Sequence, residues 1–427
     1  MRHFMRGAMP AIDKSDAVRL NQGCACITLD RKALGQALDS ESGEPGFSQR
    51  LIAAQSHAFS NVPVFLSGDE LAKMEEVIQA IEQVSELTQY SNAVLSWAPG
   101  IARRDFGPAG ALMGYDFHLG ETGPTLIEIN TNAGGAFLNA ALARAQVACC
   151  GEAVEFSSSQ CSFEDLAFEM FLNEWARQGR SGRPRTIAIV DDVPEQQFLY
   201  PELVLARQAL KQRGAHSVIA DAPRLSYGGK TLTFEGEEVD LVYNRLTDFA
   251  LERPEHRALR QAYEDGYVVL TPNPHNHALL ADKRNMSVLS NSVMLESWGA
   301  AGERLARLQA VPPTVLLTSE NAADLWQRRK TLFFKPSSGH GSKAVYRGDK
   351  ITKRVWSEIS KEKYVAQDLM RPSERIVMVD GSPVIRKLDV RLYTYQARTL
   401  IGAARIYQGQ TTNLSTPGGG FAPLFIV

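Results

Sequence analysis

Long hydrophobic runs and an excess of charge of either sign are both missing from this chain of 427 residues. No apolar stretch approaches the roughly 18–20 residues that a membrane-spanning helix requires, and residues 1–14 are basic without the apolar segment of a secretory signal. Lys and Arg number 46 against 48 Asp and Glu, so the net charge of −2 gives no general field for nucleic acid or an anionic membrane. We therefore expect a cytoplasmic protein that binds neither.

Cysteine is also scarce in this sequence. The cysteines form two close pairs and a singleton, without partner His or Cys residues at zinc spacing, which indicates reduced thiols. The pair Cys149 and Cys150 is expected in the core of a helix. With 44% hydrophobic residues the chain can bury a sizeable core, and its length favours about three domains. The cysteines are Cys24, Cys26, Cys149, Cys150 and Cys161.

A Gly-rich dinucleotide fingerprint is absent as well. Residues 186–190 (TIAIV) are typical of a buried parallel strand, but Asp191-Asp192-Val193-Pro194 follows them where the glycines would stand. The alternating pattern that continues to residue 275 predicts a small open α/β domain without a nicotinamide site. Its other expected elements are a helix at 200–213 and strands at 217–220, 239–244 and 267–272.

The rest of the chain divides by its pattern of elements. Residues 39–47 are polar and rich in Gly and Pro and predict a loop, whereas residues 67–90 open with a capping-box pattern and predict a helix. Residues 111–119 and 124–130 predict an antiparallel strand pair. The expected divisions are 1–66 (an N-terminal segment of unknown role), 67–150, 151–184 (a helical connector), 185–278 (the α/β domain) and 279–427, which is β-rich.

Lys335 stands near the end of a predicted strand at 331–336, and a Gly/Ser-rich loop follows it. Glycines let backbone N–H groups approach an anion, and the lysine supplies a point charge. The segment is not a Walker A loop, which requires Gly-Lys-Ser/Thr at the start of a helix. A phosphate-binding loop and a plain hairpin with solvated lysines both remain open here. The loop residues are Ser337, Ser338, Gly339, His340, Gly341, Ser342 and Lys343.

Arg391 and Arg405 lie on consecutive apolar segments, which predict strands at 390–396 and 400–407. Two guanidinium groups on facing strands can clamp a phosphate or a carboxylate. For either arginine taken alone, a solvated strand face is the alternative interpretation.

Asp116, Glu128 and Asn130 belong to the predicted strand pair. Alternation places Glu128 and Asn130 on one face of their strand, where Asp116 of the neighbouring strand can join them. Two carboxylates and an amide oxygen are hard ligands that suit Mg²⁺. The alternative is an edge strand with its polar residues turned outward, although a buried Glu128 would need a partner.

Together, the lysine strand, the two arginine strands and the acidic strand pair resemble an ATP-grasp ligase, in particular the ATP-binding core of bacterial glutathione synthetase. In that family the acidic segment G-x-D … E-x-N comes last, whereas here it precedes Lys335. The resemblance is therefore to a circularly permuted ATP-grasp protein, a group that includes glutathionylspermidine-synthase-like members. The matching segments are 114–116 with 128–130, Asp282-Lys283, 311–314, 389–391 and 404–406.

This resemblance implies an ATP-grasp fold of the α/β (α+β) class with ATP and Mg²⁺ as cofactors. The α/β unit at 186–275 would be the substrate domain that precedes the ATP-binding part in such ligases. Thr411 and Thr412 depart from the family, which often has a basic residue before the Asn. Similar ligases frequently form dimers, so the resemblance is compatible with a homodimer, but the sequence does not give the oligomeric state. The implied roles are Mg²⁺ binding by Asp116, Glu128 and Asn130, catalysis by Lys335, Arg391 and Arg405, and nucleotide contacts by Lys335, the loop 337–343, Gln367, Asp368, Leu369 and Asn413.

Arg245 and Asn244 are the candidates for substrate binding. They stand at the end of the predicted strand 239–244, and ligands bind at the carboxyl ends of strands in open α/β sheets. Arg245 would bind a carboxylate, and a helix-capping or surface arginine is the alternative. His275-Asn276-His277 is expected to form a loop after Pro272 and Pro274 rather than a metal site.

The function that these patterns favour is ATP-dependent ligation of a carboxylate to an amine. The carboxylate would attack the γ-phosphoryl group to give an acyl phosphate and ADP, and an amine, or less readily a thiol, would displace phosphate. The substrates would be small molecules or peptides. Two alternatives stay open: a phosphotransferase on the same scaffold that acts on a hydroxyl, and a nucleotide-binding protein without turnover.

Overall fold

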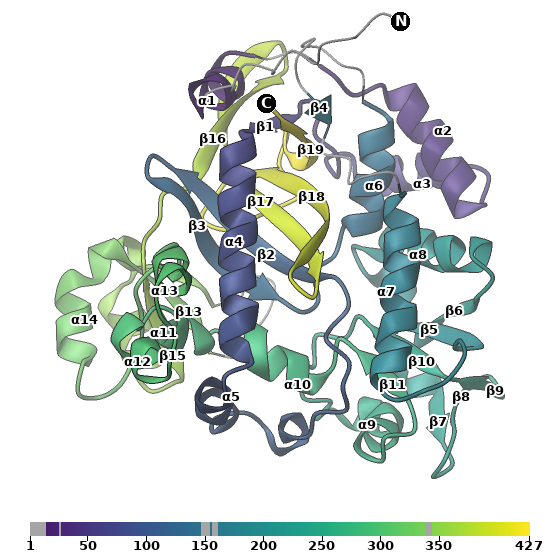
Figure 1. Cartoon of the computed structure of the whole chain (residues 1–427). Coiled ribbons are helices and arrows are strands. Elements are labelled where there is room, and N and C mark those ends of the chain that lie inside the picture. The colour runs from purple at the N-terminus through teal and green to yellow at the C-terminus, as the bar shows by residue number, and fades with distance from the viewer. Residues whose placement is uncertain (1–13, 25–26, 147–153, 156–160, 338–343) are drawn as a thin grey trace, which may run out of the picture.

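The computed structural model describes residues 14–24, 27–146, 154–155, 161–337 and 344–427. Figure 1 shows them as one α/β molecule with several sheets. Cys26, Cys149, Cys150 and the loop residues 338–343 lie outside the described residues. Within the described part, no helix combines the length and the apolar character needed to cross a membrane.

An eight-stranded sheet forms the centre of the molecule (Figure 1). The early hairpin β2–β3 pairs with the late strand β17, so segments far apart in sequence share one sheet. The strand order is β1-β19-β18-β17-β2-β3, with β16 added to β17 and β4 to β19. The strands are β1 (Val64–Leu66), β2 (Met113–Gly120), β3 (Gly123–Asn130), β4 (Val154–Glu155), β16 (Ser373–Val379), β17 (Ser382–Tyr395), β18 (Arg398–Tyr407) and β19 (Gly420–Ile426).

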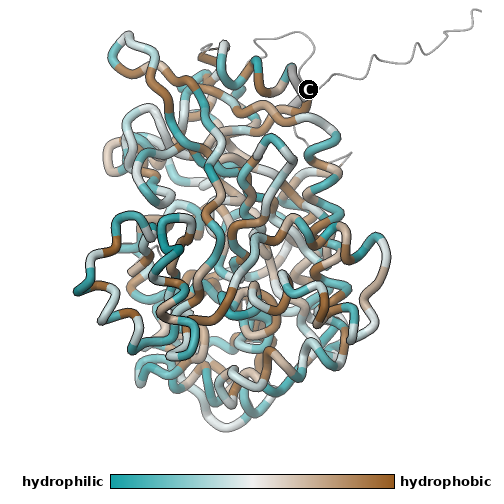
Figure 2. The backbone as a smooth tube through the Cα atoms, turned by 90° about the vertical axis from the view of Figure 1, so that its left-hand side faces the viewer, coloured by the Kyte–Doolittle hydropathy of each residue, from teal (hydrophilic) through white to brown (hydrophobic). Residues whose placement is uncertain are grey.

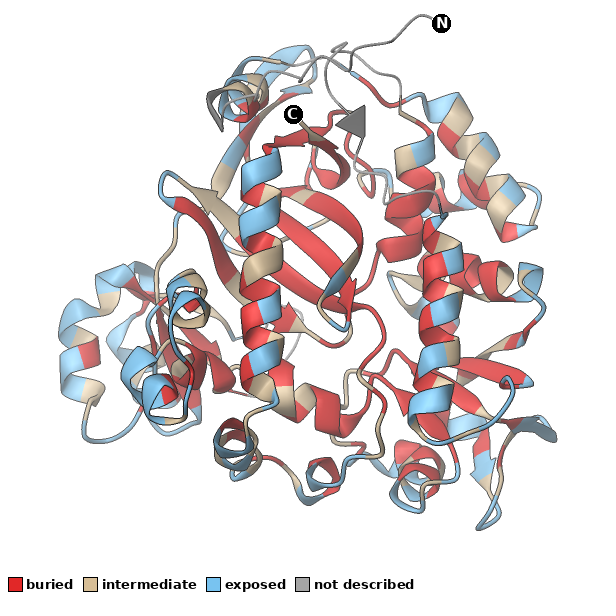
Figure 3. Ribbon diagram, viewed as in Figure 1, coloured by how far each residue is buried: buried red, intermediate tan, exposed pale blue. Residues whose placement is uncertain are grey.

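Helix α4 (Gly68–Ser85) crosses one face of this sheet with a buried stripe turned inward (Figure 3). The predicted capping box is confirmed, because the side chains of Ser67 and Glu70 each accept a hydrogen bond from the other's backbone N–H. The predicted end at residue 90 is wrong. Tyr90 belongs to a second helix, α5 (Thr88–Leu95), where it is fully buried and its hydroxyl donates to Leu279 O (2.9 Å).

The opposite face of the sheet packs on α6 (Ala136–Arg144), α7 (Phe163–Arg177) and α8 (Tyr200–Gln212), together with the N-terminal helices α2 (Arg31–Ser42) and α3 (Phe47–Ala54). The predicted loop at 39–47 is wrong, because residues 39–42 complete α2 and only residues 43–46 turn between the helices. Leu34 and Leu38 are fully buried and hold α2 in place. Helix α1 (Lys14–Gly23) lies near β1 and β16.

The predicted α/β unit is confirmed as a parallel four-stranded sheet, in the order β11-β10-β5-β6. The strand predicted at 239–244 is interrupted at Asp240, whose carboxylate accepts from Thr186 N (3.1 Å), so residues 237–239 join a separate small sheet instead. The elements are β5 (Thr186–Asp191), β6 (His216–Asp221), β10 (Leu241–Asn244), β11 (Val269–Thr271) and α9 (Arg257–Glu264), and the small sheet holds β7 (Leu225–Tyr227), β8 (Leu232–Phe234) and β9 (Glu237–Val239).

A third sheet, antiparallel in the order β12-β15-β13-β14, carries Lys335. Its core is a small cluster around Phe334, Leu325 and Ile359. Its elements are β12 (Thr314–Leu316), β13 (Leu332–Pro336), β14 (Tyr346–Arg347), β15 (Tyr364–Asp368), α14 (Ala322–Arg328) and α15 (Lys353–Ile359).

Short helices connect the α/β unit to this third sheet. The loop predicted at 275–277 is wrong, because Pro274 begins helix α10 (Pro274–Asn276) and a helical turn continues through His277–Ala281. Asn273 and Asn276 cap α10 reciprocally.

In the side view, hydrophobic segments run through the middle of the molecule and many outer loops are hydrophilic (Figure 2). The remaining helices are α11 (Asn285–Leu289), α12 (Ser292–Ser297) and α13 (Glu303–Leu308).

Candidate active site

A cavity of about 560 Å³ is lined by residues of the eight-stranded sheet, the α/β unit and the third sheet. That volume lies within the range of ordinary small-molecule and cofactor sites. Most of the residues that the sequence patterns single out meet here: Asp116, Glu128, Asn130, Arg245, Lys335, Gln367, Asp368, Leu369, Arg391 and Arg405.

Strand register brings the acidic residues and the arginines together. Asp116 of β2 pairs directly with Glu128 of β3 on one side and with Arg391 of β17 on the other, and Asp389 of β17 pairs with Arg405 of β18. The β2–β3 register shifts directly after Asp116, and such irregularities re-aim side chains at functional sites. We call the surface formed by Asp116, Glu128, Asn130, Asp389, Arg391 and Arg405 the sheet wall of the cavity.

The sheet wall contains a closed network of ion pairs. Arg391 grips Asp116 with two nitrogens (2.6 and 2.7 Å), and Arg405 bridges Asp116 (2.7 Å) and Asp389 (2.6 Å). Thr412 Oγ1 also donates to Asp389 (2.7 Å). Burial alone would raise the pKa of Asp116, but the charges of Arg391 and Arg405 outweigh it and lower the pKa to about 2. The arginines are thus held in fixed positions at the cavity edge.

Two lysines approach Glu128 from the third-sheet side of the cavity. Lys283 Nζ lies 3.2 Å from Glu128 Oε1, and Lys335 Nζ donates to Ile127 O (3.0 Å) and Gln367 Oε1 (2.7 Å). Burial lowers the pKa of Lys335 to about 8. The pKa of Glu128 is lowered as well, because Lys283 and Lys335 outweigh the opposing effect of burial. These cations form an electropositive end of the cavity.

The fit of Mg²⁺ rests on oxygen donors of β2 and β3. The described residues contain no cluster of three or more His, Cys, Asp or Glu side chains arranged for a metal. They do offer two carboxylates and one amide, the hard donors that Mg²⁺ prefers. Asp116 Oδ2 already accepts from Arg391, Arg405 and Asn130 Nδ2 (3.1 Å), whereas Oδ1 accepts from Arg391 alone among the residues that the structure describes. The Glu128 side chain keeps 34% of its surface exposed. Asp116, Glu128 and Asn130 therefore fit the ion, and Glu128 offers it the more accessible of the two carboxylates.

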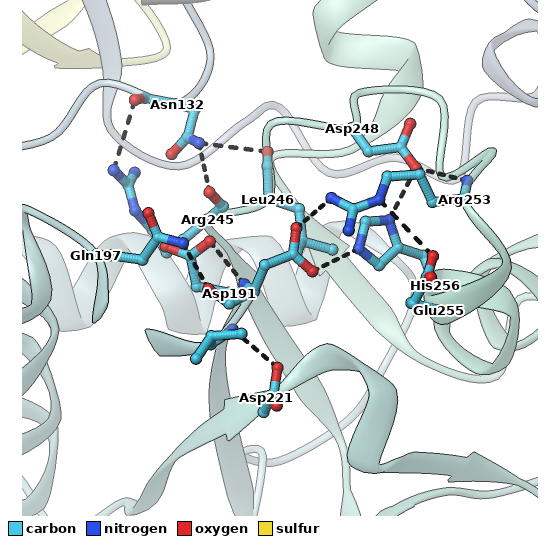
Figure 4. A network of polar contacts seen from close by, with 12 residues as sticks. Asn132, Asp191, Gln197, Asp221, Arg245, Leu246, Asp248, Arg253, Glu255 and His256 are labelled. Carbon is cyan, nitrogen blue, oxygen red and sulfur yellow. Dashed lines mark hydrogen bonds and ion pairs between the residues drawn. The ribbon is translucent and has the colours of Figure 1, made fainter. Parts of the chain in front are cut away.

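The α/β unit forms the other wall of the cavity, which we call the α/β wall and which includes Asp191 and Arg245 (Figure 4). Arg245 is only 5% exposed, yet no carboxylate of the described residues lies within ion-pair distance of it. Its guanidinium makes long contacts to Ala133 O (3.3 Å), Tyr243 Oη (3.3 Å) and Asn132 O (3.5 Å), and its Nε has no hydrogen-bond partner among the described residues. A buried guanidinium without a counter-ion is costly.

Behind the α/β wall, a fully buried histidine holds two carboxylates (Figure 4). His256 Nδ1 lies 2.8 Å from Asp248 Oδ2, and Nε2 lies 2.8 Å from Asp192 Oδ1. Arg253 also pairs with Asp192 (2.7 Å). Asp192 is therefore engaged from two sides, in contrast to Asp191 beside it.

Three predicted residues are not among those that line the cavity. Asn244 uses its amide between Pro272 O (3.0 Å) and Leu246 N (3.0 Å) and so fixes the end of β10. Asn413 is exposed and accepts from Ser415 N (2.9 Å). Ser337 is buried beside Lys335. The predicted nucleotide contacts Ser338, Gly339, His340, Gly341, Ser342 and Lys343 lie outside the described residues.

Several lining residues have no clear signal in the sequence. Burial lowers the pKa of His118 and of His277 to about 4 each, so both are neutral near pH 7. His277 stacks on Phe249 with ring centres 3.8 Å apart. Lys283 is an exception, because the resemblance of Asp282-Lys283 to ATP-grasp ligases was a signal for it. Asp191 follows a recognisable strand, but nothing local distinguishes it from Asp192.

Comparison with known proteins yields structural likeness only. No protein-family model matches this sequence, and no curated protein matches it significantly. Among solved structures, the chain resembles a glutathione synthetase-like effector of Globodera pallida in its apo form, with 12% identity, 94% of this chain and 98% of that chain covered, and a TM-score of 0.56. It also matches a candidate γ-glutamylcysteine synthetase of Methylobacillus flagellatus, with 11% identity, 85% and 89% covered, and a TM-score of 0.48.

The first of these likenesses establishes the fold over nearly the whole chain. It confirms the predicted α/β, ATP-grasp-like architecture. At 12% identity it says nothing by itself of substrates, so the function has to be argued from the cavity and its residues.

Proposed function

We propose that this protein is an ATP-dependent ligase that joins a carboxylate to an amine. The observation that carries the proposal is a single cavity that holds two lysines near Glu128, two arginines fixed on the sheet wall, and on the opposite wall an arginine without an ion pair to any described residue. A site that neutralises polyphosphate at one end and a carboxylate at the other suits such a reaction.

The electropositive end would bind ATP. Lys283 and Lys335 would neutralise phosphate oxygens, and the segment of Gln367, Asp368 and Leu369 would meet the adenine, as the family resemblance implies. Lys335 is already fixed by two acceptors, so little reorganisation is needed when a phosphate arrives. Water has to be kept from the site, because an acyl phosphate hydrolyses when it is exposed.

Glu128, Asn130 and Asp116 would hold Mg²⁺. When bound, the ion supplies charge neutralisation between phosphate oxygens. Asp116 has a second task that the sequence did not suggest, because it is the counter-ion that orients Arg391 and Arg405. Those arginines would stabilise the charge that develops on the transferred phosphoryl group.

Arg245 would bind the substrate carboxylate before the reaction. The carboxylate attacks the γ-phosphoryl group, which gives ADP and an acyl phosphate, and the amine then displaces phosphate. Most of the rate enhancement would come from positioning and charge stabilisation. A buried, unpaired guanidinium is suited to this task because the incoming carboxylate replaces a missing counter-ion.

We also infer that the order of segments is circularly permuted relative to glutathione synthetase. The direct pairing of β2 with β17 supports this inference, since it brings the early acidic hairpin into the sheet of the late arginine strands. Permutation is physically reasonable because domain termini often lie close together at the surface.

A screen for ADP release would test the function. Purified protein, ATP and Mg²⁺ are incubated with pairs of amino acids, short peptides and polyamines, and parallel samples receive hydroxylamine as a generic acceptor. We expect carboxylate-dependent ADP and phosphate, and a hydroxamate when hydroxylamine is present. A stable phosphorylated product would indicate a phosphotransferase, and no ADP with any pair would leave a nucleotide-binding protein.

A further inference from the structure

Two adjacent carboxylates stand at the carboxyl end of strand β5, and their surroundings differ. Asp192 pairs with His256 and Arg253. The Asp191 carboxylate forms no ion pair with any described residue, and among those residues it accepts one hydrogen bond, from Asp192 N to Oδ1 (2.8 Å). Both line the cavity, but only Asp191 retains a carboxylate that is not neutralised by contact.

Asp191 and Arg245 occupy equivalent places on neighbouring strands. Val190 of β5 is in register with Asn244 of β10, so the residues that come next, Asp191 at the end of β5 and Arg245 just after β10, face the same side of the sheet edge. Parallel strands lie about 4.8 Å apart, and Arg245 N also donates to Val190 O (2.8 Å). The two side chains are close enough to interact electrostatically, yet they form no ion pair within 4 Å. Within the described part of the chain, an anion without an ion pair and a cation without an ion pair therefore line the same cavity (Figure 4).

We propose that Asp191 receives the ammonium group of the amine substrate and accepts one of its protons before attack. This inference rests on the proposed ligase function and assigns the acceptor subsite within it. Arg245 would hold a carboxylate next to that subsite, so the acceptor amine and the activated carboxyl group meet at the α/β wall.

The proton and electron balance of the step is simple. One N–H proton passes from the ammonium group to Asp191 and frees the nitrogen lone pair. That pair forms the C–N bond to the acyl phosphate carbon while the C–O bond to phosphate breaks, and the departing phosphate takes the bonding electrons. The second N–H proton goes to the phosphate, which leaves as hydrogen phosphate. Asp191 then loses its proton to solvent.

The electrostatic surroundings of Asp191 suit this task. Burial is the main reason that its pKa is raised to about 6; Arg245, the hydrogen bond from Asp192 N and His256 oppose the rise, while the charge of Asp192 adds to it. A general base works best when its pKa lies near the operating pH. Asp191 would thus be charged at pH 7, ready to attract an ammonium group, and would still bind a proton readily.

The test compares charged and uncharged nucleophiles in the full-length protein. Hydroxylamine is neutral at pH 7 and needs neither a counter-ion nor a base, whereas glycine, diglycine and putrescine present ammonium groups. For Asp191→Asn we expect the amine-dependent kcat/KM to fall on the order of 100-fold. Hydroxamate formation should stay within about threefold of the wild type. In the wild type, amine-dependent kcat/KM should fall as the pH drops through about 6, and this limb should vanish in the variant.

Asp221→Asn is the matched control. Asp221 ends the neighbouring strand β6 and accepts from Val193 N (2.9 Å), but it is not among the cavity residues. Its substitution should leave both reactions unchanged. Equal loss of both reactions in Asp191→Asn, or retained amine ligation, would overturn the assignment of Asp191. Wild-type hydroxamate formation without ligation of any of the three amines would also overturn it. Absence of hydroxamate and ADP in the wild type would instead overturn the ligase function itself.

Discussion

The two walls of the cavity differ in whether their charged side chains have ion-pair partners within the described structure. On the sheet wall, Asp116, Arg391, Arg405 and Asp389 saturate one another with short ion pairs. On the α/β wall, Arg245 makes no ion pair with a described residue although it is buried. The first arrangement is complete within the fold, whereas the second needs a partner from outside.

This difference separates charged groups that stabilise the fold from charged groups that are available to bind a ligand. A satisfied network fixes its arginines before any ligand arrives, and breaking it exposes uncompensated buried charge. An unsatisfied guanidinium lowers the stability of the protein, and such a residue is expected where function requires it. The comparison therefore predicts opposite stability effects for substitutions on the two walls.

The largest expected effect is on stability, in Asp116→Ala. Arg391 would lose its carboxylate partner while it stays buried, so the free energy of unfolding should fall by about 3–5 kcal/mol. Urea denaturation at neutral pH measures it. The double variant Asp116→Ala/Arg391→Met should recover much of the loss, because no uncompensated charge remains.

Arg245→Met is the counterpart on the other wall. It removes a charge without a counter-ion, so the free energy of unfolding should stay equal or rise by up to about 2 kcal/mol. If Asp116→Ala and Arg245→Met destabilise the protein equally, the distinction between the two walls is wrong.

Turnover should respond most strongly to Glu128→Gln. The amide is a poorer Mg²⁺ ligand than the carboxylate, so the rate of ADP formation should fall on the order of 100-fold. The fold should be kept, because the Glu128–Lys283 pair is partly exposed and such pairs add little stability. Glu121→Gln, in the exposed turn of the same hairpin, is the control. Unchanged turnover at limiting Mg²⁺ would place the metal elsewhere.

Arg245→Lys should affect only the acid substrate. The lysine keeps the charge but loses the planar pair of donors, so KM for the carboxylate should rise about tenfold. KM for ATP should not change, because the nucleotide end lies on the other side of the cavity. Arg185→Lys, at an exposed position of the same unit, controls for general effects. A change in KM for ATP alone would remove Arg245 from the acid pocket.

Local patterns in the sequence predicted the strands that carry the sheet wall. Alternation gave Glu128 and Asn130 a common face, and apolar segments marked the strands of Arg391 and Arg405. The predicted start of one of these strands was wrong, since β17 begins at Ser382 rather than at residue 390. Pairing with β16 over residues 382–388 accounts for the extension, and a partner strand is not visible in local periodicity.

The ion-pair partners of these side chains could not be predicted from local sequence patterns. Arg391 and Asp116 are 275 positions apart and meet only because β17 pairs with β2. The two arginines were predicted to bind a phosphate or a carboxylate of a ligand. In the structure both form ion pairs with Asp116. In the same way, only the fold reveals that His256 engages Asp192 and leaves Asp191 open.

The smallest expected effect is a pH dependence at Lys335. Burial lowers the pKa of this lysine to about 8, so it loses its charge, and its attraction for phosphate, as the pH rises through that value. The value of kcat/KM for ATP should therefore fall a few-fold between about pH 7 and 9, since this parameter reports ionisations of the free enzyme. Lys335→Arg should keep the charge and remove the fall, because a guanidinium stays protonated throughout this range. Lys335→Ala should bind ATP weakly at every pH and likewise lack the fall. If the decline persists in both variants, a different group titrates, and the partners of Lys335 at Ile127 and Gln367 hold its charge more firmly than its burial suggests.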